Sequence, residues 1–341
     1  MPEKRGLNVA VIGVGMGRLH IESYRALDNV NVIAVADLNE ERAKSAAKEY
    51  GIPRVFTDYR KMLELEEVDA VTVCTPNYLH VPMAVDAFEA GKHVFCEKPL
   101  SVNAKEGAKA VAASKKARKI LMMCFNNRYR GDTQLLKQYV EGGDLGEIYF
   151  AKTGWVRRRG IPGLGGWFTT KSKSGGGPLI DLGVHMIDVT MWLMGNPEPT
   201  TVSGATYTEF GDKAAKASGG TYDVEDLAAG FVRFANGASM LFEASWASNV
   251  REERTYSEIL GSKGGAELSP LTIFTEQHGA LVDIQPKFRS IGGHEAAIAH
   301  FVDCILNGTQ PISPGEDGVK MMKILDALYQ SAEAGKEVQI Q

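Results

Sequence analysis

Long hydrophobic runs and blocks of like charge are both missing from this sequence. No apolar run reaches the roughly 20 residues that a transmembrane helix needs, and the opening MPEKRG leads into a short apolar stretch with no sign of a secretory signal. The 38 basic and 42 acidic side chains are interspersed and leave a formal charge of −4. We therefore expect neither a membrane nor a nucleic acid as a partner.

Cysteine is also scarce. The four cysteines are Cys74, Cys96, Cys124 and Cys304. They form no CxxC pair and show no metal-ligand spacing. Three of them end apolar segments, where a free thiol behaves as a small buried hydrophobe. We predict free thiols, no metal site and a reducing, cytoplasmic location.

Glycine, in contrast, is in excess. The chain of 341 residues contains 37 glycines, whereas average usage is about 7%. Eight of them fall within residues 160–183, and three more are Gly13, Gly15 and Gly17. Glycine clustered in this way suggests backbone that lies close to ligands. The remaining composition, 44% hydrophobic and 23% charged, excludes a disordered chain and is typical of an enzyme of one large or two medium domains.

Residues 1–126 are predicted to form a doubly wound Rossmann domain that binds NAD(P). Short apolar runs rich in Val and Ile alternate there with helical patterns. The predicted strands are Asn8–Ile12, Val32–Ala36, Ala70–Cys74, His93–Cys96 and Ile120–Cys124, with a weaker one near Val55. Continuously hydrophobic strands separated by helices indicate a parallel sheet covered on both faces.

Residues 127–341 have a different pattern and are predicted to form an α+β domain. From Thr201 onward, short β-like runs are separated by turns such as Asn236-Gly237, which is typical of antiparallel hairpins. Helical patterns cover Asp132–Glu141, Leu179–Leu193, Glu295–Asn307 and Gly315–Ala334. We expect one mainly antiparallel sheet with helices on one side.

The first chemical motif is a glycine turn between a strand and a helix. It consists of Gly13, Val14, Gly15, Met16 and Gly17. A first glycine permits the turn, and a second lets the backbone approach a pyrophosphate at the helix N-terminus. The usual GxGxxG spacing would place a third glycine where Arg18 stands, so the motif is shortened to GxGxG. A tight turn without a ligand is the alternative.

Asp37 strengthens the dinucleotide hypothesis. It ends the second predicted strand, where a carboxylate can accept hydrogen bonds from the ribose hydroxyls and would repel a 2′-phosphate. NAD is therefore favoured over NADP as the cofactor. In the alternative interpretation Asp37 only caps the following helix, and we interpret Arg42 as an exposed helix residue.

Two further loops follow strands of the same predicted sheet. The first contains Thr75, Pro76, Asn77 and His80, and the second contains Glu97 and Lys98. Ligands of open parallel sheets bind at the carboxyl ends of strands, so we predict that these residues contact the cofactor. Lys98 is suited to hydrogen-bond a substrate oxygen beside the nicotinamide or to help move its proton. A surface cation remains the alternative for Lys98, and a capping or packing role for His80.

The third motif is GGGPLIDLGVHMID, residues 175–188. On a helix, Asp181 and His185 are i and i+4 and share a face. An imidazole is a natural base for a hydroxyl proton, and a nearby carboxylate can orient it or the substrate. We expect the glycines to let a substrate or cofactor lie against the chain before this helix. An ordinary surface pair is the alternative, and zinc is weakly supported because no second His or Cys falls at ligand spacing.

Together these motifs resemble the Gfo/Idh/MocA (glucose-fructose oxidoreductase / inositol dehydrogenase) family over essentially the whole chain. The residues that carry the resemblance are the glycine turn with His20, Asp37, Thr75-Pro76-Asn77 with His80, Glu97-Lys98-Pro99, Asn127-Arg128 and residues 175–188. The resemblance implies that residues 1–126 form a Rossmann domain that binds NAD(P), and that residues 127–341 form an open-faced sheet domain that binds a sugar or polyol substrate. It also implies dimers or tetramers formed through the exposed sheet face.

The resemblance further implies roles for individual residues. Lys98, Asp181 and His185 would form the catalytic trio: His185 accepts the proton of the alcohol, Lys98 polarises the same oxygen and Asp181 positions the substrate. The Lys98-Pro99 peptide would be cis. Arg128, Arg157 and Trp167 are expected on the substrate side. Structural roles remain the alternative for Arg157, in a run of arginines, and for Trp167.

The sequence therefore predicts an NAD-dependent dehydrogenase that acts on a secondary hydroxyl or ketone of a sugar, cyclitol or glycoside. Two other functions stay open. One is an NAD-dependent glycosidase that oxidises the sugar transiently to allow elimination of the leaving group. The other is a non-catalytic regulator that binds dinucleotide and sugar; an intact Lys98, Asp181 and His185 set argues against it.

Overall fold

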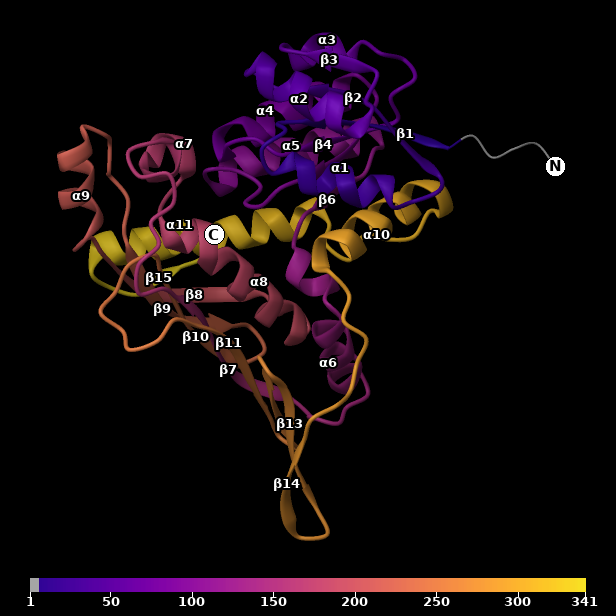
Figure 1. Ribbon diagram of the computed structural model, residues 1–341. Coiled ribbons are helices and arrows are strands. Elements are labelled where there is room, and N and C mark those ends of the chain that lie inside the picture. Colours follow the sequence, from indigo (N-terminus) through magenta and orange to yellow (C-terminus); the bar gives the residue numbers. More distant parts are fainter. Residues whose placement is uncertain (1–5) are drawn as a thin grey trace. The chain divides into compact units, whose positions relative to one another are not determined.

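The computed structural model describes residues 6–341, and the chain forms two compact units (Figure 1). The first unit extends to Ser101 and includes Lys105–Asn126 and Gly292–Val319; the second comprises Val102–Ala104, Asn127–Ile291 and Lys320–Gln341. The predicted domains were residues 1–126 and 127–341, whereas Gly292–Val319 lies in the first unit. Tertiary packing explains this difference, because Phe301 of helix α10 (Gly293–Asn307) stacks on Phe95 with ring centroids 5.3 Å apart.

The first unit is the predicted doubly wound domain. Its six-stranded sheet has the order β3-β2-β1-β4-β5-β6, and every neighbouring pair is parallel. The strands are β1 (Leu7–Ile12), β2 (Val30–Ala36), β3 (Arg54–Phe56), β4 (Ala70–Val73), β5 (His93–Cys96) and β6 (Leu121–Met123). The helical segments are α1 (Gly17–Arg25), α2 (Glu40–Tyr50), α3 (Tyr59–Leu63), η1 (Asn77–Leu79), α4 (His80–Glu89), α5 (Ala104–Ala117) and α10.

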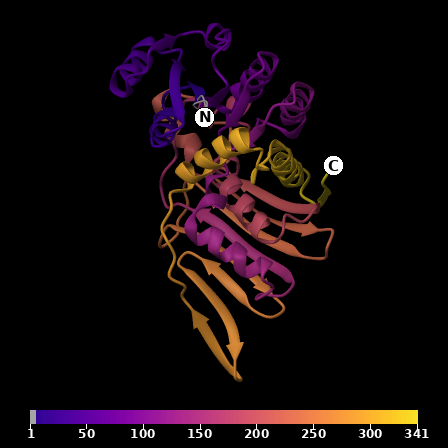
Figure 2. The same ribbon diagram turned by 90° about the vertical axis from the view of Figure 1, so that its right-hand side faces the viewer.

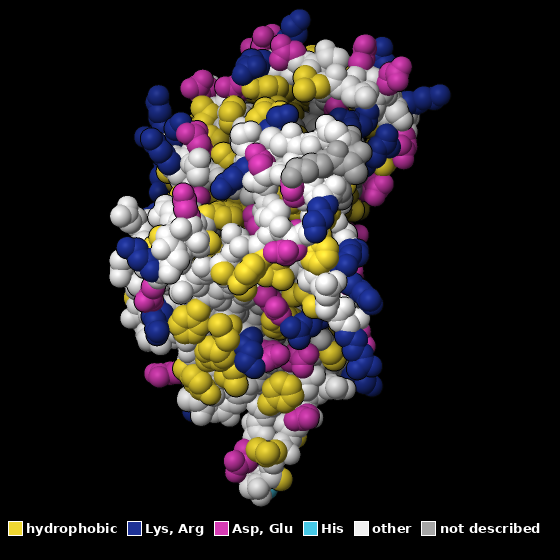
Figure 3. All heavy atoms as spheres, turned by 90° about the vertical axis from the view of Figure 1, so that its left-hand side faces the viewer, with side chains coloured by type: hydrophobic (Ala, Val, Ile, Leu, Met, Phe, Trp, Pro, Cys, Tyr) yellow, Lys and Arg dark blue, Asp and Glu magenta, His cyan; other side chains and the backbone are white. Residues whose placement is uncertain are grey.

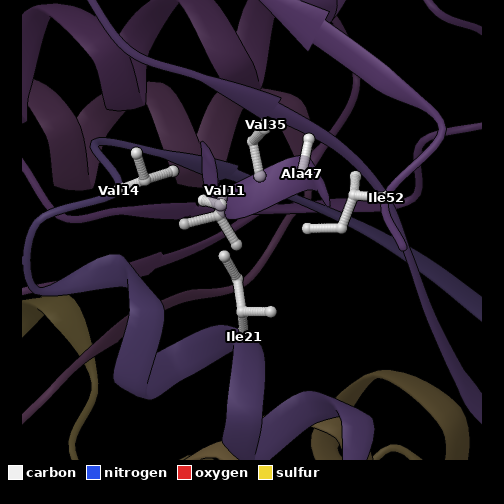
Figure 4. Packing of buried hydrophobic residues seen from close by; sticks show 7 residues of the cluster. Val11, Val14, Ile21, Val35, Ala47 and Ile52 are labelled. Atoms are coloured by element: carbon white, nitrogen blue, oxygen red, sulfur yellow. The ribbon is translucent and has the colours of Figure 1, made fainter. Parts of the chain in front are cut away.

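The core of this unit explains why its strands read as apolar runs. Val11 of β1 and Val35 of β2 are fully buried, and they pack with Ile21 of α1 and Ile52 after α2 (Figure 4). Helix α2 begins at a capping residue, Asn39, whose side chain accepts from the backbone N–H of Arg42. Buried strands and a covering helix thus place the carboxyl ends of β1 and β2 beside the glycine turn and Asp37.

The second unit contains the predicted open sheet. Its nine strands have the order β14-β13-β12-β11-β7-β10-β9-β8-β15, and all neighbours are antiparallel except β7 and β10. The strands are β7 (Ile148–Val156), β8 (Pro199–Tyr207), β9 (Leu227–Phe234), β10 (Ser239–Ser245), β11 (Arg254–Gly261), β12 (Gly265–Leu268), β13 (Leu271–Gln277), β14 (Ala280–Ile284) and β15 (Val338–Gln339).

Helices cover one face of this sheet. The helical segments are η2 (Asn126–Tyr129), α6 (Gly131–Glu141), η3 (Trp167–Thr169), α7 (Lys171–Ser174), η4 (Leu179–Gly183), α8 (Val184–Leu193), α9 (Gly211–Ser218) and α11 (Gly315–Ala334). Helix α8 packs on β7 and β11, and α6 packs on α8 (Figure 2). Along β10, Met240 and Phe242 are buried whereas Leu241 is 44% exposed. This alternation means that the other face is open.

Several details differ from the sequence expectations. Helix α9 and the strands β12, β14 and β15 were not predicted, because short elements give little periodic signal. The helix expected over Leu179–Leu193 begins with a π-helical turn, η4, before α8. Within residues 6–341, none of the helices is both long and apolar enough to cross a membrane.

Candidate functional site

The three glycines of the first turn have different surroundings. Gly13 has φ +87°, and a Cβ there would lie 2.3 Å from the carbonyl oxygen of Cys74. A Cβ at Gly17 would lie 2.7 Å from Cγ1 of Val11. Gly15 alone faces open space, with no atom within 4 Å of a Cβ built there. Gly13 and Gly17 therefore allow the turn to pack closely against the strands β1 and β4 and the residue that follows β4. Gly15 leaves the backbone of the turn accessible.

The N-terminus of α1 suits an anion. No side chain caps it at Met16, whereas α2 is capped by Asn39. The backbone N–H groups of a first helical turn lack partners within the helix, and together with the helix dipole they favour a phosphate. The open backbone at Gly15 and the uncapped helix start thus fit a dinucleotide pyrophosphate, in spite of the shortened glycine motif.

Asp37 lies directly after β2 and is buried. Its carboxylate accepts from the backbone N–H groups of Val14 at 3.0 Å and Asn39 at 2.9 Å. The guanidinium of Arg42 donates to both carboxylate oxygens, from Nε at 3.0 Å and from Nη2 at 2.7 Å. Burial alone would raise the pKa of Asp37, but these hydrogen bonds lower it overall. The interpretation of Arg42 as an exposed helix residue missed this contact.

His80 joins the two predicted cofactor loops. Its ring lies 2.7 Å from the carbonyl oxygen of Pro99 through Nδ1 and 2.7 Å from that of Thr75 through Nε2. The side chain is buried, and burial lowers its pKa. His80 therefore has the packing role that the sequence left open, and it holds the loop after β4 against the loop that contains Lys98.

A buried polar cluster surrounds Glu97. The carboxylate lies 2.7 Å from Nε2 of His20 and accepts from the backbone N–H of Lys98 at 3.2 Å. Burial would raise the pKa of Glu97, but the contact with His20 lowers it well below the usual range. His294 of α10 lies beside this cluster, with the ring centroids of His20 and His294 6.0 Å apart, and no pattern in the sequence indicates this proximity.

The same cluster contains two groups of potential metal ligands: His20 with Cys74 and Glu97, and Glu97 with Cys124 and His294. Their donor atoms lie within 4.8 Å of one another in each group. Burial raises the pKa of both thiols well above the ordinary value, which disfavours the thiolate that binds metal. The cluster is a hydrogen-bonded network that supports the start of the Lys98 loop.

Lys98 follows β5 and is half-buried. The Lys98-Pro99 peptide is cis, as the family resemblance implied. Lys98 belongs to the first unit, whereas Asp181 and His185 belong to the second. Asp181 and His185 are therefore the members of the predicted trio that lie in one unit.

Asp181 and His185 lie on consecutive turns of one helical segment. Asp181 is in η4 and His185 is in the first turn of α8; π-helical turns are frequent at functional sites. The indole Nε1–H of Trp246, which is fully buried, donates to Oδ2 of Asp181 at 2.9 Å. The ring of Trp155 lies 6.0 Å from that of His185. A carboxylate and an imidazole are thus held beside aromatic side chains.

Protein atoms fill the space beside the glycines that precede this segment. A Cβ at Gly176 would lie 1.8 Å from the hydroxyl of Tyr329, and one at Gly177 would lie 2.1 Å from the carbonyl oxygen of Glu225. The buried carboxylate of Glu225 accepts from the N–H groups of Gly177 at 3.0 Å and Leu179 at 3.1 Å. The expectation that these glycines admit a ligand is therefore wrong: they admit Tyr329 and Glu225, which cap the segment.

The predicted substrate residues differ in their surroundings. Arg128 is 2% exposed and donates to both oxygens of Asp188, at 3.0 and 2.6 Å. Its guanidinium therefore holds η2 to α8 and is not presented to a ligand, which corrects the expected substrate role. Arg157 is half-buried, with its guanidinium 5.0 Å from the ring centroid of Trp155. Trp167 stacks on Phe168 at 3.8 Å.

Comparisons with known proteins cover the whole chain. Residues 7–125 match an oxidoreductase family with an NAD-binding Rossmann fold, and residues 137–340 match the C-terminal alpha/beta domain of that family. D-glucoside 3-dehydrogenase of Escherichia coli K12 is 34% identical over 98% of this chain and 97% of its own. Myo-inositol 2-dehydrogenase of Thermotoga maritima is 26% identical over 98% of this chain and 99% of its own.

Solved structures share the fold. Levoglucosan dehydrogenase in complex with NADH and levoglucosan has a TM-score of 0.87 and 27% identity, covering 98% of this chain and 99% of that one. These relatives match both units, and not the Rossmann part alone.

Proposed function

Because the chain belongs to the Gfo/Idh/MocA family of oxidoreductases, we propose that it is an NAD-dependent dehydrogenase of a sugar, cyclitol or glycoside. The reacting group is a secondary hydroxyl or the corresponding ketone. The curated relatives named above act, by their names, on a D-glucoside and on myo-inositol, which supports a substrate with several ring hydroxyls.

The observation that carries this proposal is the pair of Asp181 and His185 on one capped helical segment. His185 is the base that takes the hydroxyl proton, because an imidazole titrates near neutral pH. Asp181, held by Trp246, orients the substrate. Lys98 donates to the reacting oxygen and stabilises the negative charge that develops on it.

The dinucleotide supplies the chemistry that side chains lack, since bound NAD accepts the hydride. The residues of this chain that would hold it are the turn around Gly15, the N-terminus of α1, and Asp37. The loops that His80 joins, with Thr75, Pro76, Asn77 and Glu97, shape the nicotinamide side in this proposal. Arg157 and Trp167 remain the proposed substrate contacts.

Kinetics of Lys98→Ala and His185→Ala test the proposal. Loss of a positioned acid or base lowers kcat by about 10²–10⁴-fold, while NADH should still bind in a fluorescence titration, because the proposed contacts with its pyrophosphate and adenosine lie elsewhere, at Gly15 and Asp37. Lys109→Ala and His278→Ala are matched controls, because both residues are exposed. Wild-type turnover in either site variant would contradict the assignment.

The same assay separates the two alternatives. A glycosidase that oxidises its substrate transiently would release aglycone from a nitrophenyl glycoside without accumulating NADH. A regulator would bind NADH yet reduce no NAD with any member of a broad sugar and polyol panel. Net NADH formation with at least one member, lost in His185→Ala, supports the dehydrogenase.

We also propose that the chain forms homodimers or homotetramers through the open face of the second sheet. An apolar groove on this face is lined by Phe231, Leu241 and Tyr256, and Leu241 pairs directly with Phe231 across β9 and β10. Figure 3 shows hydrophobic side chains gathered above the hairpin of β13 and β14, which forms the lower tip of the view. Leu241→Asp should shift the protein to monomers in light scattering; an unchanged mass would contradict the proposal.

A cytoplasmic location belongs to the same proposal. It is supported by the state of Cys74, Cys96, Cys124 and Cys304, all of which are free and buried. Free thiols are usual in a reducing compartment.

A further inference from the structure

We propose that the substrate is a glycoside with an apolar, aromatic aglycone, and that this aglycone lies on an apolar patch beside Asp181 and His185. The patch consists of half-buried hydrophobic side chains from three segments of the second unit: Trp155, Ile161, Phe168 and Tyr222. The inference rests on the proposed function, in which Asp181 and His185 act on the sugar ring. It narrows the proposed substrates, a sugar, cyclitol or glycoside, to one class.

The patch adjoins the proposed catalytic pair through two tryptophans. Trp155 is itself part of the patch, and its ring centroid lies 6.0 Å from that of His185. The patch side chains pack against a buried cluster that includes Trp246, and the indole of Trp246 donates to Asp181 at 2.9 Å. Polar groups for a sugar ring and carbon atoms for an apolar group therefore lie next to each other within one unit.

The hydroxyl groups at the patch bond within the protein. The hydroxyl of Tyr222 donates to the backbone carbonyl of Glu225 at 3.4 Å. The hydroxyl of Thr169, which follows Phe168, donates to the carbonyl of Thr221 at 2.7 Å. These bonds use the polar atoms inside the fold, so the patch offers mainly carbon to a ligand.

Such a surface favours an apolar aglycone over more hydroxyls. A cyclitol carries hydroxyls around its whole ring, and a hydroxyl placed against carbon loses water without gaining a partner. An apolar group at the same place gains free energy from burial. Arg157 is the charged neighbour of the patch, with its guanidinium 5.0 Å from the ring centroid of Trp155. Because a guanidinium is planar, it can also stack on an aromatic aglycone.

The segments that supply the patch are tied together. The glycine-rich loop, residues 160–170, meets the segment before β9 in an antiparallel bridge between Gly165 and Thr221. The backbone N–H of Asp223 donates to the carbonyl of Thr169 at 3.1 Å, and the backbone N–H of Lys171 donates to the carboxylate of Asp223 at 2.5 Å. A patch held in this way is formed before the substrate arrives, which reduces the entropy cost of binding.

Paired substrates test the inference in the wild-type protein. The panel contains methyl and phenyl glycosides of several hexoses in both anomeric forms, together with the free hexoses and myo-inositol. NADH formation gives kcat/KM for each compound. For the hexose that is oxidised best, we expect kcat/KM of the phenyl glycoside to exceed that of the methyl glycoside by about tenfold or more, because the phenyl ring buries apolar surface on the patch.

Two substitutions of Tyr222 form a matched pair. Tyr222→Ser removes the ring and should lower the phenyl-to-methyl ratio of kcat/KM by at least about threefold, because apolar contact is lost. Tyr222→Phe keeps the ring and should keep the ratio, since the hydroxyl is turned toward Glu225. Phe168→Ala should act like Tyr222→Ser. Tyr149→Ser is the control elsewhere on β7, because Tyr149 is 55% exposed and does not belong to the patch.

The outcomes separate failure of this inference from failure of the proposed function. If free hexoses, myo-inositol or methyl glycosides are oxidised as well as the phenyl glycosides, the dehydrogenase stands and the aglycone preference is overturned. An unchanged ratio in both Tyr222→Ser and Phe168→Ala overturns the role of the patch. If no compound reduces NAD, the proposed function itself fails. The ratio does not depend on the amount of folded enzyme, and the wild-type comparison remains decisive where a variant does not fold.

Discussion

The chain has two glycine-rich helix starts, and they are built in opposite ways. At α1 no side chain caps the helix, and Gly15 faces open space. At η4 the carboxylate of Glu225 caps the segment, and the space beside Gly177 is occupied by Glu225 itself. At α1 no side chain of the capping residue accepts from the first N–H groups of the helix, which suits a ligand. At η4 the carboxylate of Glu225 accepts from the N–H groups of Gly177 and Leu179.

The comparison teaches that glycine before a helix has two meanings. In the first case it removes side chains from the path of a ligand. In the second it lets another part of the fold approach, so that the helical segment with Asp181 and His185 begins at a fixed position. The difference depends on what stands within a few ångströms of the missing Cβ, which only the structure provides.

Gly177→Ala should give the largest effect. Its Cβ would lie 2.1 Å from a backbone oxygen of Glu225, and overpacking of this kind lowers the free energy of unfolding by about 1–3 kcal/mol. We expect a lower melting temperature and weakened sugar turnover. A melting temperature equal to that of the wild type would show that the Glu225 backbone can move away from the new Cβ. The proposed contrast between a close contact at Gly177 and open space at Gly15 would then be wrong.

Gly15→Ala is the matched substitution at the other helix start. Since nothing lies within 4 Å of the new Cβ, the melting temperature without cofactor should not change. NADH affinity should fall by about tenfold, the cost of about 1.4 kcal/mol when the pyrophosphate loses close approach to the backbone. Unchanged NADH binding in a fluorescence titration would show that the cofactor does not lie against Gly15.

Trp246→Phe sharpens the account of the second start. It keeps an aromatic ring but removes the donor to Asp181, and a hydrogen bond to a charged group is worth about 1.5–3 kcal/mol. We expect kcat/KM for the sugar to fall at least about tenfold with NADH affinity unchanged. Combined with Asp181→Asn, the two effects should not add; full additivity would mean that Trp246 does not act through Asp181.

Glu225→Gln gives the smallest effect and a dependence on pH. Burial raises the pKa of Glu225 above its ordinary 4.5, against hydrogen bonds that lower it. The folded protein therefore keeps this proton to higher pH than the unfolded chain, so the stabilisation is present below 4.5 and is lost as pH rises through the folded pKa. We therefore expect the melting temperature of the wild type minus that of Glu225→Gln to decrease as the pH is raised toward neutrality. A difference that does not change with pH would contradict this prediction.

Much of the fold was predictable because its signals are local. The apolar run His93–Cys96 forms β5 with the predicted bounds, and the long amphipathic pattern Gly315–Ala334 forms α11 with the predicted bounds. A motif in the sequence placed Asp181 and His185 on one helical segment, and the family resemblance implied the cis Lys98-Pro99 peptide. The contact of Glu225 with Gly177 and that of Trp246 with Asp181 join residues 48 and 65 positions apart, and no spacing in the sequence reports such contacts. Arg42 is only five residues from Asp37, but the sequence does not specify the direction of its side chain.

The transfer of deuterium from substrate to nicotinamide tests the central claim most directly. A sugar or glycoside that reduces NAD in the panel would be labelled at the reacting carbon and incubated with the enzyme, and the NADH formed would be analysed by mass spectrometry. We expect NADH that carries one deuterium, and none formed by His185→Ala. Unlabelled NADH, or aglycone release without any labelled NADH, would contradict direct hydride transfer by a dehydrogenase.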